Sequence, residues 1–94
     1  MIRHMVFWKF RAGTEKEQER FLSGLAALYG VIPALKRCEV LRDVAGGENW
    51  DAALIAEFDS METLAAYKDD PRHREVSALC KSIRLSRCAV DAEI

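Results

Sequence analysis

Apolar and polar residues alternate along residues 2–10 with the two-residue period of a β-strand. Apolar side chains dominate both sides of this stretch, which favours a central strand in a sheet that is covered on both faces. His4 is the only polar residue on the even-numbered side. A histidine among apolar neighbours needs a hydrogen-bond partner or a function, so His4 is the first candidate site residue.

A helix is predicted after this strand, because apolar residues recur at helical spacing up to Tyr29. Thr14 and Glu17 have the spacing of a capping box at the start of this helix. Gly30 is typical of a helix C-cap and marks its predicted end. Residues 35–44 then predict a strand whose polarity indicates a more exposed position.

The second half of the chain again alternates strand and helix. Residues 46–49 predict a turn, and residues 50–58 predict a third strand with two apolar sides. Residues 59–60 offer an N-cap for a short helix, which the Asp-Asp-Pro sequence at 69–71 interrupts. The second of these acids can cap a further helix that has the proline at its first position. Residues 87–94 alternate cleanly as a final strand.

The resulting order of elements, βαββαβ, is that of the ferredoxin-like split βαβ motif. It predicts one α+β domain over residues 1–94, with a four-stranded antiparallel sheet and helices on one face. The other face would carry Met5, Phe7, Ala53 and Ile55, a large apolar patch for a monomer. We therefore expect a homodimer in which two open sheet faces pack together as a dimeric α/β barrel. The alternative is a monomer with scattered apolar residues on that face.

Composition and charge narrow the choice of partners. The 94 residues carry a net charge of −1 without a basic block, so neither nucleic acid nor a membrane is an expected partner. The sequence shows no signal-peptide pattern and no long apolar run. Cys38, Cys80 and Cys88 are odd in number and lack C-x-x-C spacing, which favours free thiols and a cytoplasmic location. No metal site built from side chains and no cofactor are expected.

Three segments together resemble the Dabb family, the stress-responsive dimeric α/β-barrel domains. They are the opening I-R-H-M-V-F-W-K-F, the turn I-P-A-L-K at 32–36 and the run E-F-D-S-M-E-T-L-A-A-Y-K-D-D-P-R-H-R-E at 57–75. The resemblance covers essentially the whole chain. The fold that it implies is the same ferredoxin-like dimeric barrel that the order of elements predicts.

The resemblance also implies a candidate site. A plant polyketide cyclase of this family performs an intramolecular aldol condensation with a His/Tyr pair, and a further histidine lies on its first strand. His4, Tyr67 and His73 match these positions in residue type. Two pocket positions differ, because Trp8 stands where that enzyme has a smaller aliphatic residue and Leu25 replaces an aromatic one. The resemblance therefore implies neither the size of the pocket nor the identity of the substrate.

The chemistry of these residues fits proton transfer. His73 lies at the N-terminal end of a helix, where the helix dipole disfavours a charged imidazolium. A neutral imidazole suits a general base that removes a proton next to a carbonyl, with the enolate oxygen held by Tyr67 or His4. The expected ligand is a small, mostly apolar molecule bound between the sheet and the helices. The expected lining of that pocket is Val6, Trp8, Phe21, Leu22, Leu25, Leu54 and Ala56.

Three functions remain open on the sequence. The first is a cofactor-independent cyclase or isomerase that uses His73 as its base. The second is a non-catalytic, stress-related structural or ligand-binding dimer, in which His4 is a core histidine bonded to a backbone carbonyl or to Tyr67 and His73 only helps to cap its helix. The third is a small cofactor-free monooxygenase, an activity found among dimeric ferredoxin-like barrels.

The remaining polar features have structural interpretations. Residues 69–70 are expected to cap a helix rather than to bind a metal. Glu57 is expected to form an ion pair at the dimer interface, with Lys9 or Arg3 as its partner. The family resemblance further implies a cation site built from backbone carbonyls near Tyr29, Ile32 and Leu35, since carbonyl oxygens suit magnesium or sodium.

Overall fold

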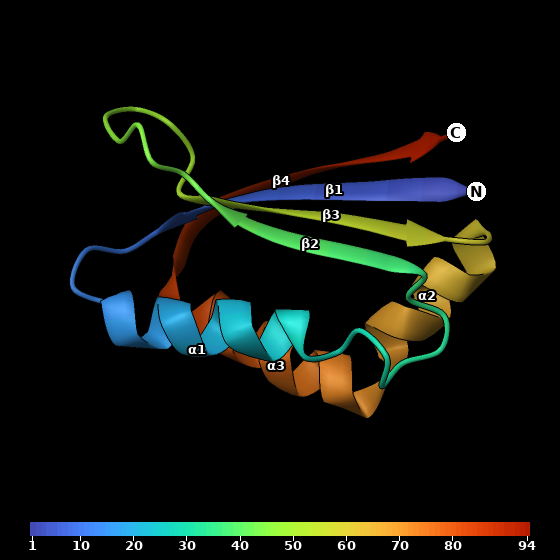
Figure 1. The fold of residues 1–94 in the computed structure, drawn as a ribbon. Helices are drawn as coiled ribbons and strands as arrows, with labels where there is room; N and C mark the ends of the chain where they lie inside the picture. The colour runs from blue at the N-terminus through green and yellow to red at the C-terminus, as the bar shows by residue number, and fades with distance from the viewer.

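The chain folds into two layers, a four-stranded sheet and a layer of three helices that covers one of its faces (Figure 1). The computed structural model describes residues 1–94. Its elements are β1 (Ile2–Phe10), α1 (Glu15–Ala26), β2 (Arg37–Arg42), β3 (Ala52–Phe58), α2 (Met61–Asp69), α3 (Pro71–Ile83) and β4 (Arg84–Glu93). This order confirms the predicted ferredoxin-like α+β fold. None of the three helices combines the length and apolar character needed to cross a membrane.

The sheet has the strand order β2-β3-β1-β4, and every neighbouring pair is antiparallel. β1 is therefore a central strand, as its two apolar sides predict. β4 pairs with β1 along its length, so the two ends of the chain lie side by side (Figure 1). The register of this pairing sets Asp91 directly opposite His4.

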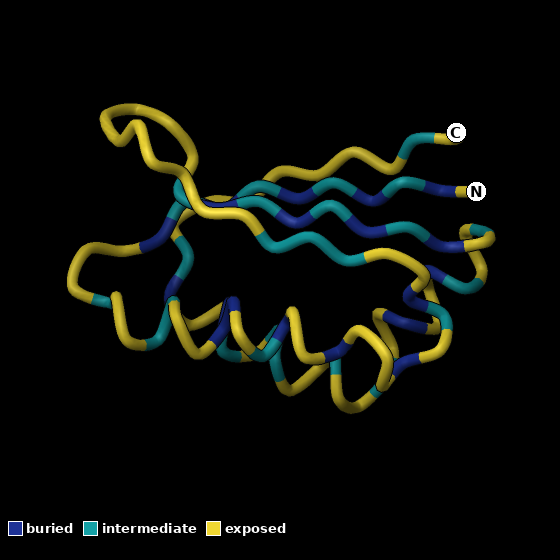
Figure 2. Tube along the Cα trace, in the orientation of Figure 1, coloured by how far each residue is buried: buried dark blue, intermediate teal, exposed yellow.

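The core lies between the sheet and the helices, because the even-numbered side chains of β1 and β3 face the helical layer. Figure 2 shows the result as buried and half-buried positions that follow one another along both strands. β4 differs, because it is exposed along most of its length. The helices contribute buried side chains to the same core: Phe21, Leu22 and Leu25 from α1, Leu64 and Tyr67 from α2, Cys80 and Ile83 from α3.

Helix α1 begins after Thr14 as predicted, but the predicted capping box does not form. The Thr14 hydroxyl donates a hydrogen bond to the carbonyl oxygen of Arg11 at 2.6 Å and accepts one from the Gln18 side chain at 2.9 Å. These bonds turn the hydroxyl back towards the preceding turn. It is therefore not available to the backbone N–H groups at the start of the helix.

The same helix ends earlier than predicted, at Ala26 instead of close to Gly30. The N–H groups of Leu28 and Tyr29 bond to carbonyls three residues back, which is the tighter 3₁₀ pattern common at helix ends. Gly30 then takes a left-handed φ of 84°. Leu28 remains buried through these turns, which explains why its spacing looks helical in the sequence.

The predicted capping of the second helical region is confirmed. Ser60 and Thr63 form a reciprocal capping box at the start of α2. The Asp70 carboxylate accepts a hydrogen bond from the backbone N–H of Arg72 at 2.9 Å, and Pro71 is the first residue of α3. The Arg72 side chain is the main cause that lowers the pKa of Asp70 to about 2. Asp70 therefore caps α3 as predicted, while Asp69 is the last residue of α2 and forms an ion pair with Arg74.

The strands differ from prediction at their ends. β2 and β3 are shorter than 35–44 and 50–58, because the turn between them starts at Asp43. The Asp43 carboxylate accepts hydrogen bonds from the Gly46 N–H at 2.6 Å and from the Asn49 side chain at 3.0 Å. β4 is longer than predicted, since it starts at Arg84 directly after α3.

The sheet face that no helix covers is called the open face below. As predicted, β1 and β3 present half-buried apolar side chains on it, and the outer strands extend the apolar area. Its apolar residues are Met5, Phe7, Leu41, Ala53, Ile55, Cys88, Val90 and Ala92, and the charged residues Arg3, Arg37, Glu39 and Glu57 lie at one end of the same face.

Glu57 lies at one end of the open face between two guanidinium groups. Its carboxylate contacts Arg3 at 2.9 Å and Arg37 at 2.9 Å, and these contacts lower its pKa, with Arg37 as the larger cause. The predicted pairing with Arg3 is confirmed. The alternative pairing with Lys9 is wrong, because the Lys9 ammonium instead contacts the Asp51 carboxylate at 3.3 Å.

Candidate functional site

His4 is buried on the helix-facing side of β1, with only 3% of its surface exposed. Its Nδ1–H donates a hydrogen bond to the carboxylate of Asp91, which the β1–β4 pairing holds opposite. This bond gives a hydrogen-bond partner to His4, the only polar side chain on the helix-facing side of β1. It also fixes the ring tautomer, since a neutral imidazole that is protonated at Nδ1 has its lone pair at Nε2.

His73 is the third residue of α3 and is half-buried. Its Nδ1 lies 3.2 Å from the carbonyl oxygen of Lys68, near the end of α2, and donates a hydrogen bond to it. Its ring packs against the ring of Tyr67 with a centroid distance of 4.5 Å. The break at Pro71 thus lets His73 lie against the preceding helix, and Nε2 of the neutral ring again remains a free acceptor.

Both imidazoles favour their neutral form. Burial lowers the pKa of His4, although the hydrogen bond and the negative charge of Asp91 act in the opposite direction. Burial is also the main cause that lowers the pKa of His73, and the positive charges of Lys68 and Arg87 add to the effect. The neutral state agrees with the sequence prediction for His73, but loss of solvent contributes more than the prediction from the helix dipole alone implied.

Tyr67 is completely buried, and its ring lies between Phe58 at 4.9 Å and His73 at 4.5 Å. Its hydroxyl has no hydrogen-bond partner, and burial raises the pKa of the phenol. Tyr67 lines neither of the two cavities that contain His4 and His73. The structure therefore brings its ring against His73 without a hydrogen bond between them.

An inner cavity of about 50 Å³ lies between the sheet and the helices beside both histidines. Of the residues predicted to line a pocket here, Val6, Trp8, Phe21, Leu25 and Leu54 do so, while Leu22 and Ala56 are buried elsewhere in the core. The Trp8 ring packs edge-on against Phe21 at a centroid distance of 5.0 Å and forms part of the cavity wall. The cavity suits a water molecule or two rather than an organic ligand.

A groove of about 600 Å³ lies above the same two histidines, between α2, α3 and β4. We call it the histidine groove. Its volume lies in the range of small-molecule sites. In contrast to the predicted apolar pocket, its lining is almost entirely polar: His4, Lys68, Asp69, His73, Arg74, Ser77, Ala78, Lys81, Arg84 and Arg87.

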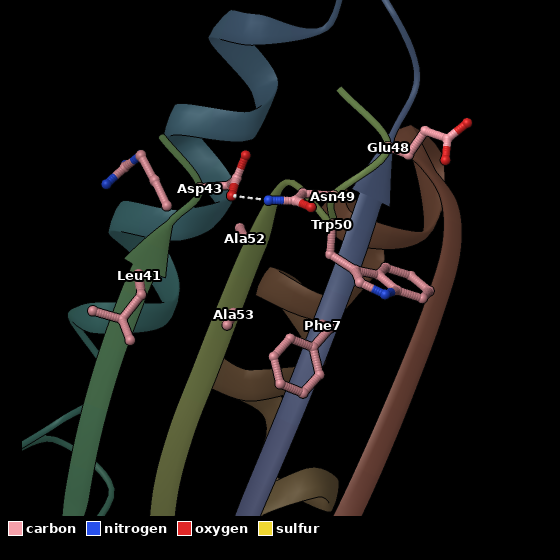
Figure 3. A pocket seen from close by; sticks show the side chains of 9 residues that line it. Phe7, Leu41, Asp43, Glu48, Asn49, Trp50, Ala52 and Ala53 are labelled. Carbon is pink, nitrogen blue, oxygen red and sulfur yellow. Dashed lines mark hydrogen bonds between the residues drawn. The ribbon is translucent and has the colours of Figure 1, made fainter. Parts of the chain in front are cut away.

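A further hollow of about 410 Å³ lies on the open face, and neither histidine lines it (Figure 3). Phe7, Leu41 and Ala53 form its floor, and Trp50 and Glu48 of the β2–β3 turn stand beside it. The dashed bond from Asn49 to Asp43 in Figure 3 ties the turn to the end of β2. This hollow is part of the apolar open face rather than a continuation of the histidine groove.

The loop after α1 carries the backbone carbonyls of the family-derived cation site, and one of the three already accepts a hydrogen bond. The carbonyl oxygen of Ile32 accepts a hydrogen bond from the Leu35 N–H at 3.1 Å. The Arg72 guanidinium donates to the neighbouring carbonyl of Val31 at 3.2 Å, which places a positive charge at this loop. The carbonyls of Tyr29 and Leu35 have no such contact, so the cation site stays a prediction from the family resemblance.

Together these features define a class, the ferredoxin-like α/β proteins with one histidine on the first strand and another after the break in the second helical region. More specifically, the chain belongs to the Dabb family, because the family model described as the stress responsive A/B barrel domain matches residues 2–94. A comparison with curated proteins finds no match.

Solved structures agree with this assignment. A dimeric ferredoxin-like protein of unknown function from Bacteroides fragilis is 28% identical, with a TM-score of 0.88 over 99% of this chain and 95% of that one. A dimeric ferredoxin-like protein of unknown function from Thermobifida fusca is also 28% identical, with a TM-score of 0.88 over 99% and 90% of the two chains. Hydroxynitrile lyase from Passiflora edulis shares the fold at 15% identity, with a TM-score of 0.86 over 99% and 92%.

The lowered histidine pKa values predict how stability depends on pH. The pKa of each group in the folded state lies below its ordinary value of 6.5, so the unfolded chain binds more protons as the pH falls through that value. We expect the free energy of unfolding to be highest above about pH 6.5 and to fall between about pH 6.5 and 5, before the carboxylates titrate. Urea unfolding at several pH values and a fixed protein concentration measures this free energy.

The variant His73→Gln should flatten this pH dependence, because it removes one of the two titrating groups. Glu62→Gln, an exposed substitution on α2, serves as the control and should leave it unchanged. An equally steep fall in the His73→Gln variant would contradict the lowered pKa of His73.

Proposed function

We propose that this Dabb protein is a cytoplasmic homodimer that binds a small organic molecule in the histidine groove and transfers a proton next to a carbonyl without a cofactor. The reaction class is that of a cyclase or isomerase. The observation that carries this proposal is the pair of neutral imidazoles at the groove, whose Nδ1 atoms are both occupied. Each ring therefore offers Nε2 as a proton acceptor to a ligand.

The two imidazoles are suited to different steps. Asp91 behind His4 stabilises the imidazolium that forms when His4 Nε2 accepts a proton from carbon. The electron pair left on the substrate becomes an enolate, whose oxygen is stabilised by the positive charge of the groove lining. The enolate carbon then attacks a second carbonyl of the same molecule, or the proton returns at another atom. In the cyclisation, the alkoxide formed by this attack recovers the proton from the His4 imidazolium, which becomes neutral again. His73, the base predicted from the sequence, is the more exposed ring, and its free Nε2 can relay this proton.

Homodimerisation rests on a separate observation. The open face is apolar, it contains the hollow beneath the β2–β3 turn, and two related proteins of 28% identity are dimeric. A second copy packed face to face would remove this surface from water. The thiols of Cys38, Cys80 and Cys88 are all unpaired, which supports a reducing compartment such as the cytoplasm.

Solvent proton exchange tests the proposed chemistry without knowledge of the natural substrate. In D₂O, we expect the protein to accelerate deuterium incorporation at the carbon between the two carbonyls of benzoylacetate, observed by NMR. Replacement of His4 or His73 by Gln should slow this exchange at least about 100-fold, which is the usual contribution of a general base. Glu62→Gln on the outside of α2 should keep the wild-type rate.

The outcomes separate proton-transfer catalysis from a non-catalytic role. If no carbonyl compound exchanges faster with the protein than without it, proton transfer is wrong, and ligand binding by a non-catalytic dimer becomes the function. Tyr67→Phe tests the predicted His/Tyr pair. A large loss would place the Tyr67 hydroxyl in the reaction, and a wild-type rate would restrict Tyr67 to packing against His73.

A further inference from the structure

The histidine groove gathers positive charge that the sequence does not show as a block. Lys68 from α2, Arg74 and Lys81 from α3, and Arg84 and Arg87 from β4 all line it. These are five of the chain's 14 basic residues, although the chain as a whole has a net charge of −1. The fold therefore concentrates positive charge at one groove and leaves the rest of the surface negative.

Most of these charges have no protein partner. Only Arg74 forms an ion pair, with Asp69 at 3.3 Å, and both side chains of that pair are largely exposed. Asp91, the other carboxylate nearby, is already engaged by His4. Lys68, Lys81 and Arg87 are exposed and free of any carboxylate contact, so they can reorient towards a ligand without breaking an existing bond.

The size and lining of the groove indicate what it can hold. A volume of about 600 Å³ suits one small molecule rather than a nucleic-acid strand or a protein segment. Ala78 is the only apolar residue in its lining, so recognition must come from charge and hydrogen bonds. Cations from all three bordering elements surround the two neutral imidazoles, so an anionic group on the ligand is the natural complement.

We infer that the histidine groove selects small organic anions, with a carboxylate or phosphate held by Lys68 and Arg87 and the reactive part of the molecule beside His4 and His73. This inference rests on the proposed function of the same site and adds its substrate class. It replaces the mostly apolar ligand predicted from the sequence by a molecule with an anionic end.

Binding of matched probes tests this inference independently of any reaction. We would follow the imidazole NMR signals of His4 and His73 during titration with benzoate, phenyl phosphate and the neutral analogue benzamide. Benzoate and phenyl phosphate should bind at least about tenfold more tightly than benzamide, with an affinity that falls as salt rises. Comparison of benzoate with phenyl phosphate shows which anionic group the groove prefers.

A charge-matched pair of variants locates the effect. The double variant Lys68→Gln, Arg87→Gln should lose at least about tenfold in benzoate affinity. The double variant Lys16→Gln, Arg20→Gln changes the net charge equally but lies on the exposed side of α1, and should change affinity less than about twofold.

The inference is overturned if benzamide binds as tightly as benzoate, if both double variants behave alike, or if neither anion shifts the histidine signals at up to about 20 mM. It is also overturned if a short single-stranded oligonucleotide binds more tightly than either anion. Anion binding that persists while deuterium exchange fails would reject the proton-transfer function and leave this inference standing.

Discussion

The substitution Phe7→Glu should convert the protein from a dimer into a monomer. Phe7 lies near the middle of the open face. Met5 is its neighbour on β1, Ala53 is opposite it on β3, and Phe7 lines the hollow shown in Figure 3. In a face-to-face dimer, the variant would bury two unpaired carboxylates, one from each copy. An uncompensated buried charge costs several kcal/mol, so the dissociation constant should rise by at least about 100-fold.

Sedimentation at micromolar concentrations distinguishes a 10.6 kDa protomer from its dimer. Ala66→Glu, which adds the same charge on the exposed side of α2, is the matched control and should remain dimeric. Circular dichroism should show intact secondary structure in both variants, because the carboxylate introduced on β1 would be solvated in the monomer. A Phe7→Glu protein that stays dimeric at the same concentrations would show that another surface forms the dimer.

The fold could be predicted from sequence because the strands and helix starts carry strong local signals. Residues 2–10 alternate without interruption, Ser60 and Asp70 cap their helices, and Pro71 marks the second of these starts. The errors fall where tertiary contacts compete with local preference. Thr14 bonds back to the turn before α1, and the turns after Ala26 keep Leu28 buried without an α-helix.

The two histidines of the candidate site could be predicted from the sequence, but their surroundings could not. His4 and His73 are visible as unusual residues and by family resemblance, but the partner of His4 is Asp91, 87 positions away. That contact depends on the register between the first and last strands, which no local pattern specifies. The alternation of β4 does place Arg87 and Asp91 on one side. The signal was therefore present, but only the structure shows that this side faces the histidines.

The positive charge of the histidine groove was likewise not predictable from local sequence patterns. The sequence has no basic block, and the prediction of a mostly apolar ligand followed from the apolar neighbours of His4. Lys68, Lys81 and Arg87 come from three different elements and meet only in the folded chain. Linear charge patterns reveal extended basic segments, but they do not reveal a small concave site assembled from separate helices and strands.

The substitution Trp8→Ala should have the largest effect on stability among the residues of the site. Trp8 is 4% exposed and packs on Phe21 at the inner cavity. Removal of its indole loses apolar burial and leaves a void, a combination that costs about 3–5 kcal/mol for a buried tryptophan. The void would enlarge the cavity of about 50 Å³ beside His4 and His73. Urea unfolding at fixed protein concentration measures the loss, and Leu85→Ala, at a 59% exposed position on β4, should cost far less.

The enlarged cavity gives this variant a second, functional readout. The space left by the indole ring would adjoin Phe21, Leu25 and Leu54, so indole should raise the unfolding midpoint of Trp8→Ala but not that of the wild type. Trp8→Phe, which removes less volume, should retain more stability and should accept benzene in place of indole. If indole stabilises the wild type equally, the space beside His4 is already open and Trp8 does not close it. If it stabilises only the variant, Trp8 is the residue that confines ligands of the wild-type protein to the outer, positively charged groove.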